Sequence, residues 1–259
     1  MSLPLPDDAE RTLLAGDDWI YQRKRGHRTS TDDVITAACA VEAARRTHGE
    51  APGAIGRYAD IGCGIGSVLL LTARSLSPGY ALGVEAQSES VALLSATLAE
   101  LPLARRPTVV HGDLRAAEPQ ALGTFDLVTG SPPYFPLGTG VEPADPQRRA
   151  CRFEVRGGVE AYLGCAARLL APGGIFVMVA QTSLDERVRA GAKEAGLSLR
   201  RRWDFWMRED RQDPFLTVYE HGDPVAEPSR TTLAIRTASG AITPAFTALR
   251  ASIGLTTRD

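Results

Sequence analysis

The stretch RYADIGCGIGSVLLL, residues 57–71, combines a short apolar strand, a glycine-rich turn and the start of an apolar helix. The turn runs from Asp60 through Gly62 and Gly64 to Gly66. Glycines let a ligand approach the backbone, and the free N–H groups and dipole at a helix N-terminus attract polar groups. The stretch therefore predicts a strand–turn–helix unit whose turn faces a small ligand.

Strands and helices alternate on both sides of this unit. The predicted strands are 56–61, 80–84, 108–110, 125–129 and 175–180, and the predicted helices are 31–47, 67–76, 88–100 and 158–170. Ser30 or Thr31 is the expected N-cap of the first helix, and Ala171–Gly174 should separate the last helix from the strand at 175. Short apolar strands separated by helices predict a doubly wound, mostly parallel sheet with both faces covered.

The pattern changes beyond Leu197. Residues 199–207, 215–219 and 233–236 are strand-like, no helix of comparable length separates them, and Ser239-Gly240 is typical of a hairpin turn. We therefore expect antiparallel strands in this part of an α/β fold. The predicted organisation is an N-terminal extension (1–30) and a single domain (31–259), of which 223–259 form a strand or hairpin appendage.

Bulk composition limits the classes of function. The chain has 259 residues and a net charge of −2, so any surface that attracts a polyanion must be a local patch. Its four cysteines form no CxxC pair and no zinc-ligand spacing, which favours reduced thiols and no metal site. The acidic, proline-containing first twenty residues do not resemble a leader peptide, and no apolar run is long enough to span a membrane. We expect a cytoplasmic protein.

Three signals indicate the ligand. The turn differs from the dinucleotide pattern GxGxxG because its third glycine comes one residue early and Asp60 precedes the first, a spacing that suits S-adenosylmethionine (SAM). Glu85 with Ala86 follows the second strand, where an acid can accept both ribose hydroxyls. Asp113 with Leu114 follows the third, where an acid can accept from the adenine amino group. Each signal alone is weak, but all three lie where open α/β sheets bind ligands.

The fourth strand ends in Ser131-Pro132-Pro133-Tyr134. This matches the (Asn/Asp/Ser)-Pro-Pro-(Tyr/Phe/Trp) motif of methyltransferases that modify a planar nitrogen. Such a nitrogen is a poor nucleophile because its lone pair is delocalised, and acceptors around its N–H groups favour the reactive form. The Ser131 hydroxyl and the Pro132 carbonyl can serve as these acceptors, the prolines hold the backbone, and Tyr134 offers a face for a flat group.

The chain at this point resembles a known family, the bacterial tRNA1(Val) adenine-N6 methyltransferases that act beside the anticodon. Three segments carry the likeness: Tyr21-Gln22 with 26–32 (GHRTSTD), Tyr134–Gly138, and 149–154 (RACRFE). The resemblance spans most of residues 17–250 and implies a Rossmann-like class I methyltransferase fold with SAM as cofactor. It also implies cofactor contacts at Arg28, Thr31 and Asp32, and substrate contacts at Phe135, Arg149 and Arg152.

The chain departs from the family pattern in three places. Ser131 stands where the family usually has Asn or Asp, and a hydroxyl can donate as well as accept. Phe153 replaces a histidine of the family. Residues 208–214 (REDRQDP) lack the family's usual basic pattern. These changes suggest a relative whose target differs.

Three basic clusters favour an RNA substrate, most simply a tRNA. They are residues 23–28, residues 148–156 and Arg200–Arg202, and the last is followed by Trp203, Phe205 and Trp206. Aromatic side chains among basic ones suit stacking on unpaired bases, although basic residues also commonly form solvated surfaces.

Other functions stay open on the sequence. A protein glutamine N5-methyltransferase uses a similar motif, but it carries an N-terminal helical domain for which about 55 residues leave little room. A DNA amino methyltransferase tolerates serine at the first motif position, but it usually needs a target-recognition domain. A SAM-binding protein without catalysis, acting as a partner, is the alternative outside the enzymes.

Overall fold

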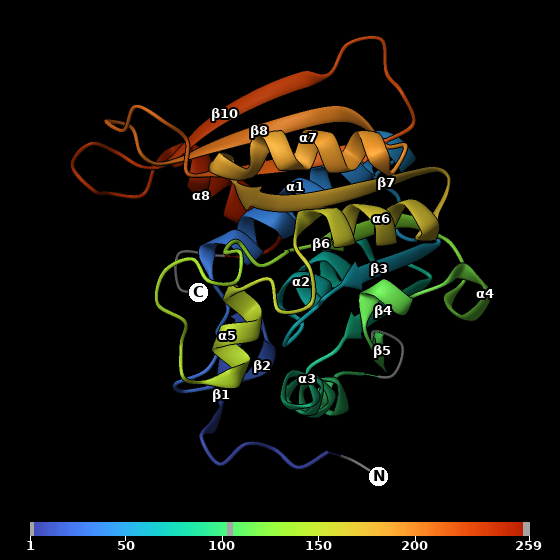
Figure 1. Ribbon diagram of the computed structural model, residues 1–259, viewed down its shortest axis with the longest axis vertical. Helices are drawn as coiled ribbons and strands as arrows, with labels where there is room; N and C mark the ends of the chain where they lie inside the picture. The colour runs from blue at the N-terminus through green and yellow to red at the C-terminus, as the bar shows by residue number, and fades with distance from the viewer. Residues whose placement is uncertain (1–2, 103–105, 256–259) are drawn as a thin grey trace.

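The computed structural model describes residues 3–102 and 106–255, in which strands and helices alternate (Figure 1). The strands are β1 (Ala9–Ala15), β2 (Asp18–Arg23), β3 (Arg57–Ile61), β4 (Tyr80–Glu85), β5 (Thr108–His111), β6 (Phe125–Gly130), β7 (Leu170–Gln181), β8 (Ser198–Arg208), β9 (Leu216–Gly222) and β10 (Ser229–Arg236). The helices are α1 (Thr31–His48), α2 (Ser67–Leu76), α3 (Ser88–Glu100), α4 (Pro119–Leu122), α5 (Pro146–Arg152), α6 (Val159–Leu169), α7 (Asp185–Glu194) and α8 (Pro244–Ala251). Short 3₁₀ turns cover Leu114–Ala116 and Thr182–Leu184.

Eight strands form the main sheet, in the order β10-β8-β9-β7-β6-β3-β4-β5. Within this sheet only β9 runs against the others, because it pairs antiparallel with both β7 and β8. The predicted mostly parallel α/β fold is confirmed. The expected direction of the last strand is wrong, since β10 pairs parallel with β8.

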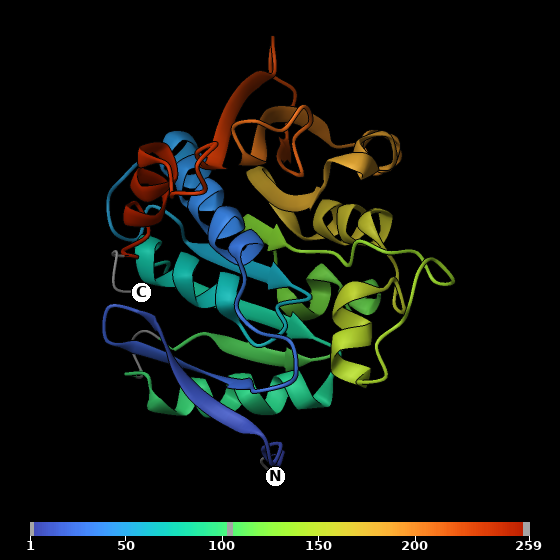
Figure 2. The same cartoon turned by 90° about the vertical axis from the view of Figure 1, so that its left-hand side faces the viewer.

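Helices cover both faces of the sheet. Contacts place α1, α2, α3 and α8 on one face and α4, α6 and α7 on the other (Figure 2). Along β7, Ile175, Val177 and Val179 pack into the first layer, whereas Phe176 and Met178 pack into the second. Successive side chains of a strand point to opposite faces, so a strand buried on both sides must be apolar throughout.

A capping box fixes the start of α1. The Ser30 backbone N–H donates to Asp33 Oδ2 over 2.9 Å, and the Ser30 side chain caps the first turn in return. This arrangement satisfies free N–H groups of the helix and agrees with the predicted cap at Ser30 or Thr31. It also places the acidic first turn, Asp32 and Asp33, at the edge of the sheet where the site lies.

The N-terminal segment forms a hairpin that the alternation of helices and strands did not predict. β1 and β2 pair antiparallel, and β2 packs on α3, where the Tyr21 N–H donates to Thr97 Oγ1 over 2.9 Å. Figure 2 shows the hairpin lying beside α2 and crossing in front of α3. The division of the chain at residue 30 stays a prediction.

One predicted boundary is wrong. Residues 171–174 do not separate helix from strand, because β7 already starts at Leu170 and pairs there with Phe125. The expected turn at Ser239-Gly240 is present: the Thr237 N–H donates to the Ala241 carbonyl, and one antiparallel bridge joins Arg236 and Ile242. The chain then enters α8, which packs beside β10 and α1.

Candidate active site

A cavity lies at the carboxyl edge of the sheet, where the loops after β3, β4, β5 and β6 meet the start of α1 and the end of α5. In Figure 2, α5 lies beside the tips of these parallel strands. Open α/β sheets bind ligands at this edge. The predicted residues that line the cavity are Asp32, Asp60, Gly62, Gly64, Glu85, Ala86, Asp113, Leu114, Ser131, Pro132, Pro133 and Tyr134.

The three glycines of the turn meet different surroundings. A Cβ on Gly62 would overlap the Tyr162 hydroxyl, and one on Gly66 would lie 2.5 Å from Leu94 Cδ1. A Cβ on Gly64 would meet no atom within 4 Å. Gly62 and Gly66 thus allow the turn to pack, whereas Gly64 leaves open space that a ligand can fill.

Asp60 is a buried carboxyl at the end of β3. Thr129 Oγ1 donates to Asp60 Oδ1 over 2.8 Å, and the Tyr58 hydroxyl lies 2.8 Å from the same threonine oxygen. Burial raises the pKa of Asp60 to about 8, and the nearby Asp33 carboxyl adds to this rise. Burial and Asp32 also raise the pKa of Asp33. A cluster of carboxyls that resist ionisation is a site that a cation would stabilise.

Glu85 and Asp113 are held by backbone groups. Glu85 accepts from the Gly64 N–H over 2.8 Å and from the Gln87 N–H over 2.6 Å, while burial raises its pKa. Asp113 caps a 3₁₀ turn and accepts three bonds from Arg115, two at Oδ1 and one at Oδ2, which lowers its pKa. Because each carboxylate oxygen can accept about two bonds, Oδ2 keeps capacity for one further donor.

Ser131 is the first residue after β6 and lines the cavity, and its buried hydroxyl has no hydrogen-bond partner among the described residues. Its Oγ is inaccessible to solvent and makes no hydrogen bond to any residue that the structure describes. Buried polar atoms are nearly always hydrogen-bonded, so an exception at a cavity indicates a ligand contact. Pro132 and Pro133 follow with fixed φ and hold the backbone at this point.

Tyr134 has two roles in the fold. Its ring packs against the core under α1, and its hydroxyl donates to Asp32 Oδ2 over 2.8 Å. Burial, together with Asp32, raises the pKa of Tyr134 well above its usual value, so the hydroxyl stays a donor. The side chain that should stack on a substrate is therefore anchored at its far end.

Several cavity residues were not predicted. They include His27, Asp33, Gln87, Cys151, Arg156 and Tyr162. Burial acts to lower the pKa of His27, but Cys151, Asp32 and Glu85 outweigh it and raise that pKa. Gln87 donates to Cys151 Sγ over 3.4 Å. His27 and Cys151 lie in segments that carry the family resemblance, and Arg156 lies in a basic run. No sequence signal marked the other three, which reach the cavity through the fold of different elements.

Comparisons with known proteins agree with this geometry. The chain is 29% identical over 194 residues to the tRNA1(Val) (adenine(37)-N6)-methyltransferase of Escherichia fergusonii, covering 74% of the chain and 78% of that protein. It is 33% identical to the protein of that name from Shigella sonnei, and the match covers 60% of the chain and 60% of that protein. It is 32% identical to the one from Citrobacter koseri, and the match covers 60% of the chain and 63% of that protein. The chain thus spans less than two thirds of the latter two. No family model matches.

Solved structures show the same fold. A predicted O-methyltransferase of Agrobacterium tumefaciens superposes with a TM-score of 0.61 at 17% identity, over 86% of this chain and 97% of that one. A putative RNA methyltransferase of Pyrococcus horikoshii has a TM-score of 0.53 at 16% identity, over 78% and 93%. The chain has the fold of class I methyltransferases. The predicted fold class is confirmed, and the names of the sequence relatives agree with the predicted relationship.

The cavity of this methyltransferase fits SAM. Bound SAM carries a sulfonium and an ammonium, and the cavity offers the buried Asp60 and Glu85 carboxyls with raised pKa values. The space above Gly64 and the remaining acceptor of Asp113 suit a ligand that lies along the strand tips. Individual contacts of these residues with SAM stay predictions.

We expect Gly64→Ala to weaken SAM binding by about 5- to 150-fold, because a methyl group would enter the ligand space and overpacking costs about 1–3 kcal/mol. Gly240→Ala is the matched control: both glycines have positive φ, +56° and +93°, and neither has an atom within 4 Å of the added Cβ. Both variants should lose similar stability to thermal unfolding, but only Gly64→Ala should change the SAM affinity in calorimetry. Equal SAM affinities would place the cofactor elsewhere.

Some predicted cofactor contacts lie outside the cavity of the methyltransferase. Arg28 pairs with Glu10 of β1 and donates to the Arg23 carbonyl, and Thr31 is exposed at the first position of α1. Gly66 contacts α3 through Leu94. In this structure these three residues shape the surroundings of the cavity and do not line it.

The predicted substrate contacts also lie outside the cavity. Phe135 packs against Phe153, with ring centroids 5.5 Å apart, and the guanidinium of Arg152 lies 5.6 Å from the Phe135 ring. Arg149 pairs with Glu142. These residues form the outer side of the loop that carries α5, so a substrate role at this surface stays a prediction.

The third basic cluster does not form the expected stacking surface. Trp203 and Phe205 are buried in the core. The three arginines are paired, Arg200 with Glu220, Arg201 with Glu42 and Arg202 with Asp204 and Asp185. Trp203 Nε1 and Arg201 both donate to Glu42 of α1, so rings and arginines of this strand are held by the fold.

Within residues 3–102 and 106–255, no group of three or more His, Cys, Asp or Glu side chains is arranged to hold a metal ion. The described helices include none that is both long and apolar enough to cross a bilayer.

Proposed function

We propose that this methyltransferase transfers the methyl group of SAM to an exocyclic amino nitrogen, N6 of an adenine in a tRNA. The observation that carries the proposal is the buried Ser131 hydroxyl, which lines the cavity without a partner among the described residues at the start of Ser-Pro-Pro-Tyr. An acceptor at this place suits an N–H donor of the substrate. Sequence relatives that carry the name tRNA1(Val) (adenine(37)-N6)-methyltransferase support adenine as the acceptor.

The residues act on the amine by orientation and polarisation. Bound SAM supplies an electrophilic methyl group. Ser131 Oγ and the Pro132 carbonyl accept the two N–H groups of the amine, which concentrates its lone pair on nitrogen. Tyr134 holds the base plane by stacking, and its hydroxyl bond to Asp32 keeps the ring in place. The proton released after transfer leaves to water.

A tRNA loop is a suitable source of the adenine. Bases in a loop are already unpaired, so moving one into a pocket costs less than taking it from a duplex. A tRNA substrate also supports a cytoplasmic location. The alternatives, protein glutamine and DNA, present planar nitrogens of similar chemistry.

The test is transfer of radiolabel from SAM to total tRNA, total protein or DNA, followed by identification of the methylated monomer. N6-methyladenosine from tRNA is expected. Label in glutamine alone, or in DNA alone, would replace the RNA proposal. No transfer, with SAM still bound, would favour a binding partner without catalysis.

We expect Ser131→Ala to lower the rate of methyl transfer by about 10-fold, because removal of one hydrogen-bond acceptor in a buried site costs about 1–3 kcal/mol. SAM affinity should stay within about twofold. Ser131→Asn, which restores an acceptor, should retain activity at or above that of the natural chain. Single-turnover rates at saturating SAM measure both variants, and an unchanged rate for Ser131→Ala would remove Ser131 from the mechanism.

A further inference from the structure

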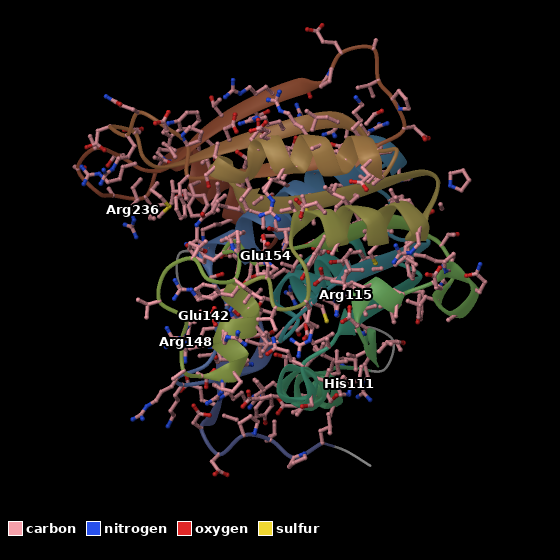
Figure 3. The ribbon with its side chains drawn as sticks, in the orientation of Figure 1. His111, Arg115, Glu142, Arg148, Glu154 and Arg236 are labelled. Atoms are coloured by element: carbon pink, nitrogen blue, oxygen red, sulfur yellow. The ribbon has the colours of Figure 1, made fainter. Side chains whose placement is uncertain are left out.

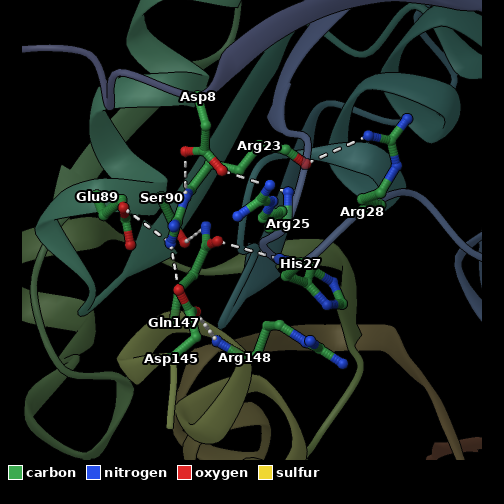
Figure 4. Close-up of polar contacts among 10 residues, drawn as sticks. All are labelled: Asp8, Arg23, Arg25, His27, Arg28, Glu89, Ser90, Asp145, Gln147 and Arg148. Carbon is green, nitrogen blue, oxygen red and sulfur yellow. Dashed lines mark hydrogen bonds and ion pairs between the residues drawn. The ribbon is translucent and has the colours of Figure 1, made fainter. Parts of the chain in front are cut away.

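Two basic segments that lie far apart in the sequence meet beside the cavity. Residues 23–28 connect β2 to α1, and residues 148–156 comprise the end of α5 and the loop behind it. The His27 N–H donates to Gln147 Oε1 over 3.0 Å, and Gln147 Nε2 donates to Ser90 Oγ of α3 over 3.2 Å. Figure 4 shows this junction, with the side chains of Arg25, His27 and Arg148 around it.

Arg23 holds the junction together through three ion pairs. Its guanidinium binds Asp8 Oδ1 at 2.7 Å, Asp145 Oδ2 at 2.7 Å and Glu89 Oε1 at 3.1 Å (Figure 4). These acids come from the segment before β1, from the N-cap of α5 and from α3. Only 15% of the Arg23 side chain is exposed, so this arginine builds the surface but does not belong to it.

Other acids at the junction are also neutralised. Glu10 pairs with Arg28, Glu142 pairs with Arg149, and Glu154 pairs with Arg187. Figure 3 shows Glu142 and Arg148 together beside α5, with Glu154 on the side toward the sheet. The acids so far named are thus engaged with other arginines, although the three around Arg23 outnumber its single positive charge. The remaining cations of the two segments have no carboxylate within ion-pair distance among the described residues.

Five cations remain on this surface: Lys24, Arg25, Arg148, Arg152 and Arg156. All five are exposed, and within the described residues none forms an ion pair with a carboxylate. Arg152 contacts the ring of Phe135 at this surface, and Arg156 lines the cavity itself. A second hollow, between the start of α3 and α5, is lined by Arg149 and Arg156 and continues from the cavity. We call these five residues the cationic rim.

The contrast with Arg200–Arg202 shows what distinguishes the rim. Those three arginines are also close together in the sequence, but each forms an ion pair with a carboxylate of the protein. Because the whole chain carries a charge of −2, a group of cations without ion pairs at one side of the cavity is a local property of this surface.

We propose that the cationic rim binds the phosphates of the RNA strand that flanks the target nucleotide. This inference rests on the proposed function and names the surface that would present the base to the site. Arg and Lys side chains neutralise phosphates, and the released counterions make such binding depend steeply on salt. The rim lies next to Ser131 and Tyr134 through the cavity that Arg156 shares with them, so a strand held there can place one base inside.

The test compares Arg25→Ala/Arg148→Ala with Lys193→Ala. Lys193 is also exposed and without an ion pair among the described residues, but it lies in the last turn of α7, which leads to the start of β8 and hence to the opposite edge of the sheet. The probe is a synthetic anticodon stem-loop of tRNA1(Val) with a fluorescent 5′ label. Fluorescence anisotropy gives its Kd at about 50 to 200 mM salt, the range over which phosphate binding weakens strongly, and calorimetry gives the SAM affinity.

The double variant should bind the stem-loop at least about 10-fold more weakly at the lowest salt concentration. The slope of log Kd against log salt should fall by about 0.7 for each phosphate that the variant no longer neutralises, which is the value for single strands. Lys193→Ala should match the natural chain, and SAM affinity should be unchanged in all three. If the double variant keeps the Kd and slope of the natural chain, the rim proposal is wrong, even if the stem-loop is still methylated.

Failure of the proposed function gives a different result. The natural chain would then neither bind nor methylate the stem-loop, and label would appear in protein or DNA; this also overturns the rim as an RNA surface. Thermal unfolding confirms that the variants fold. Should Arg25→Ala/Arg148→Ala be unstable, Lys24→Ala/Arg152→Ala tests the same rim at two other exposed positions and should again weaken the stem-loop Kd and salt slope.

Discussion

Replacing Tyr134 by alanine should lower methyl transfer by up to about 150-fold, while SAM affinity stays within about threefold. Loss of an aromatic stacking partner costs about 1–3 kcal/mol per base, and the affected interaction forms only with the acceptor. The loss should appear in kcat/KM for the RNA, measured under steady-state conditions with saturating SAM. A collapse of SAM binding instead would show that Tyr134 supports the cofactor and does not receive the substrate.

Tyr134→Phe separates the ring from its anchor. The phenylalanine keeps the stacking face but loses the 2.8 Å bond to Asp32 Oδ2. We expect an intermediate loss, smaller than that of Tyr134→Ala, because the variant keeps the stacking ring and loses only the bond that anchors it. If Tyr134→Phe were as inactive as Tyr134→Ala, the hydroxyl and not the ring would carry the function.

The parallel half of the fold was predictable because its signals are local. Strands buried on both faces are short apolar runs, and the turn from Asp60 to Gly66 marks the crossover to a helix. α2 and α3 were predicted with their observed bounds, 67–76 and 88–100. Each element here is defined by residues adjacent in the sequence.

The other elements depend on partners that are distant in the sequence. β10 runs parallel to β8 because it closes the edge of the sheet under α8, and no residue within 229–236 encodes that direction. In the β1–β2 hairpin, apolar and polar residues alternate only weakly. Gly16-Asp17 between its strands is nevertheless a two-residue turn signal that could have revealed the hairpin. In the sequence, Trp203 and the arginines before it resemble a nucleic-acid surface. In the structure Trp203 is buried and the arginines are paired with acids.

The predicted site residues that line the cavity are mostly those at the ends of strands. Asp60, Glu85, Asp113 and Ser131 follow successive strands, and parallel strands bring their carboxyl ends together. The residues contributed by α5 and by the segment before α1, such as His27 and Cys151, were missed because a long loop folds back over the cavity. Their positions depend on the Arg23 ion pairs, which no local pattern encodes.

The second prediction with a large effect concerns how stability and SAM affinity depend on pH. Burial raises the pKa of Asp60 to about 8, far above its usual value, so between about pH 4 and pH 8 the folded chain holds a proton that the unfolded chain has released. Unfolding free energy without SAM should therefore decrease as pH rises through this range, by at most about 1.4 kcal/mol per pH unit from this group. Asp33 and Glu85, whose pKa values are also raised, act in the same direction.

Without SAM the folded chain keeps Asp60 protonated. Cationic SAM should reverse this, because it favours the ionised carboxylate of Asp60 over the protonated form. SAM affinity should then increase by up to about 10-fold per pH unit between about pH 6 and pH 8, with one proton released per SAM bound. Calorimetry in two buffers of different ionisation enthalpy measures the affinity and the proton together. Asp60→Asn keeps an acceptor for the Thr129 hydroxyl but cannot ionise, so its SAM affinity should be lower at pH 8 and nearly independent of pH. An unchanged pH slope in Asp60→Asn would assign the proton to Asp33 or Glu85, and a flat profile in the natural chain would mean that the buried carboxyls do not bind the positive groups of SAM.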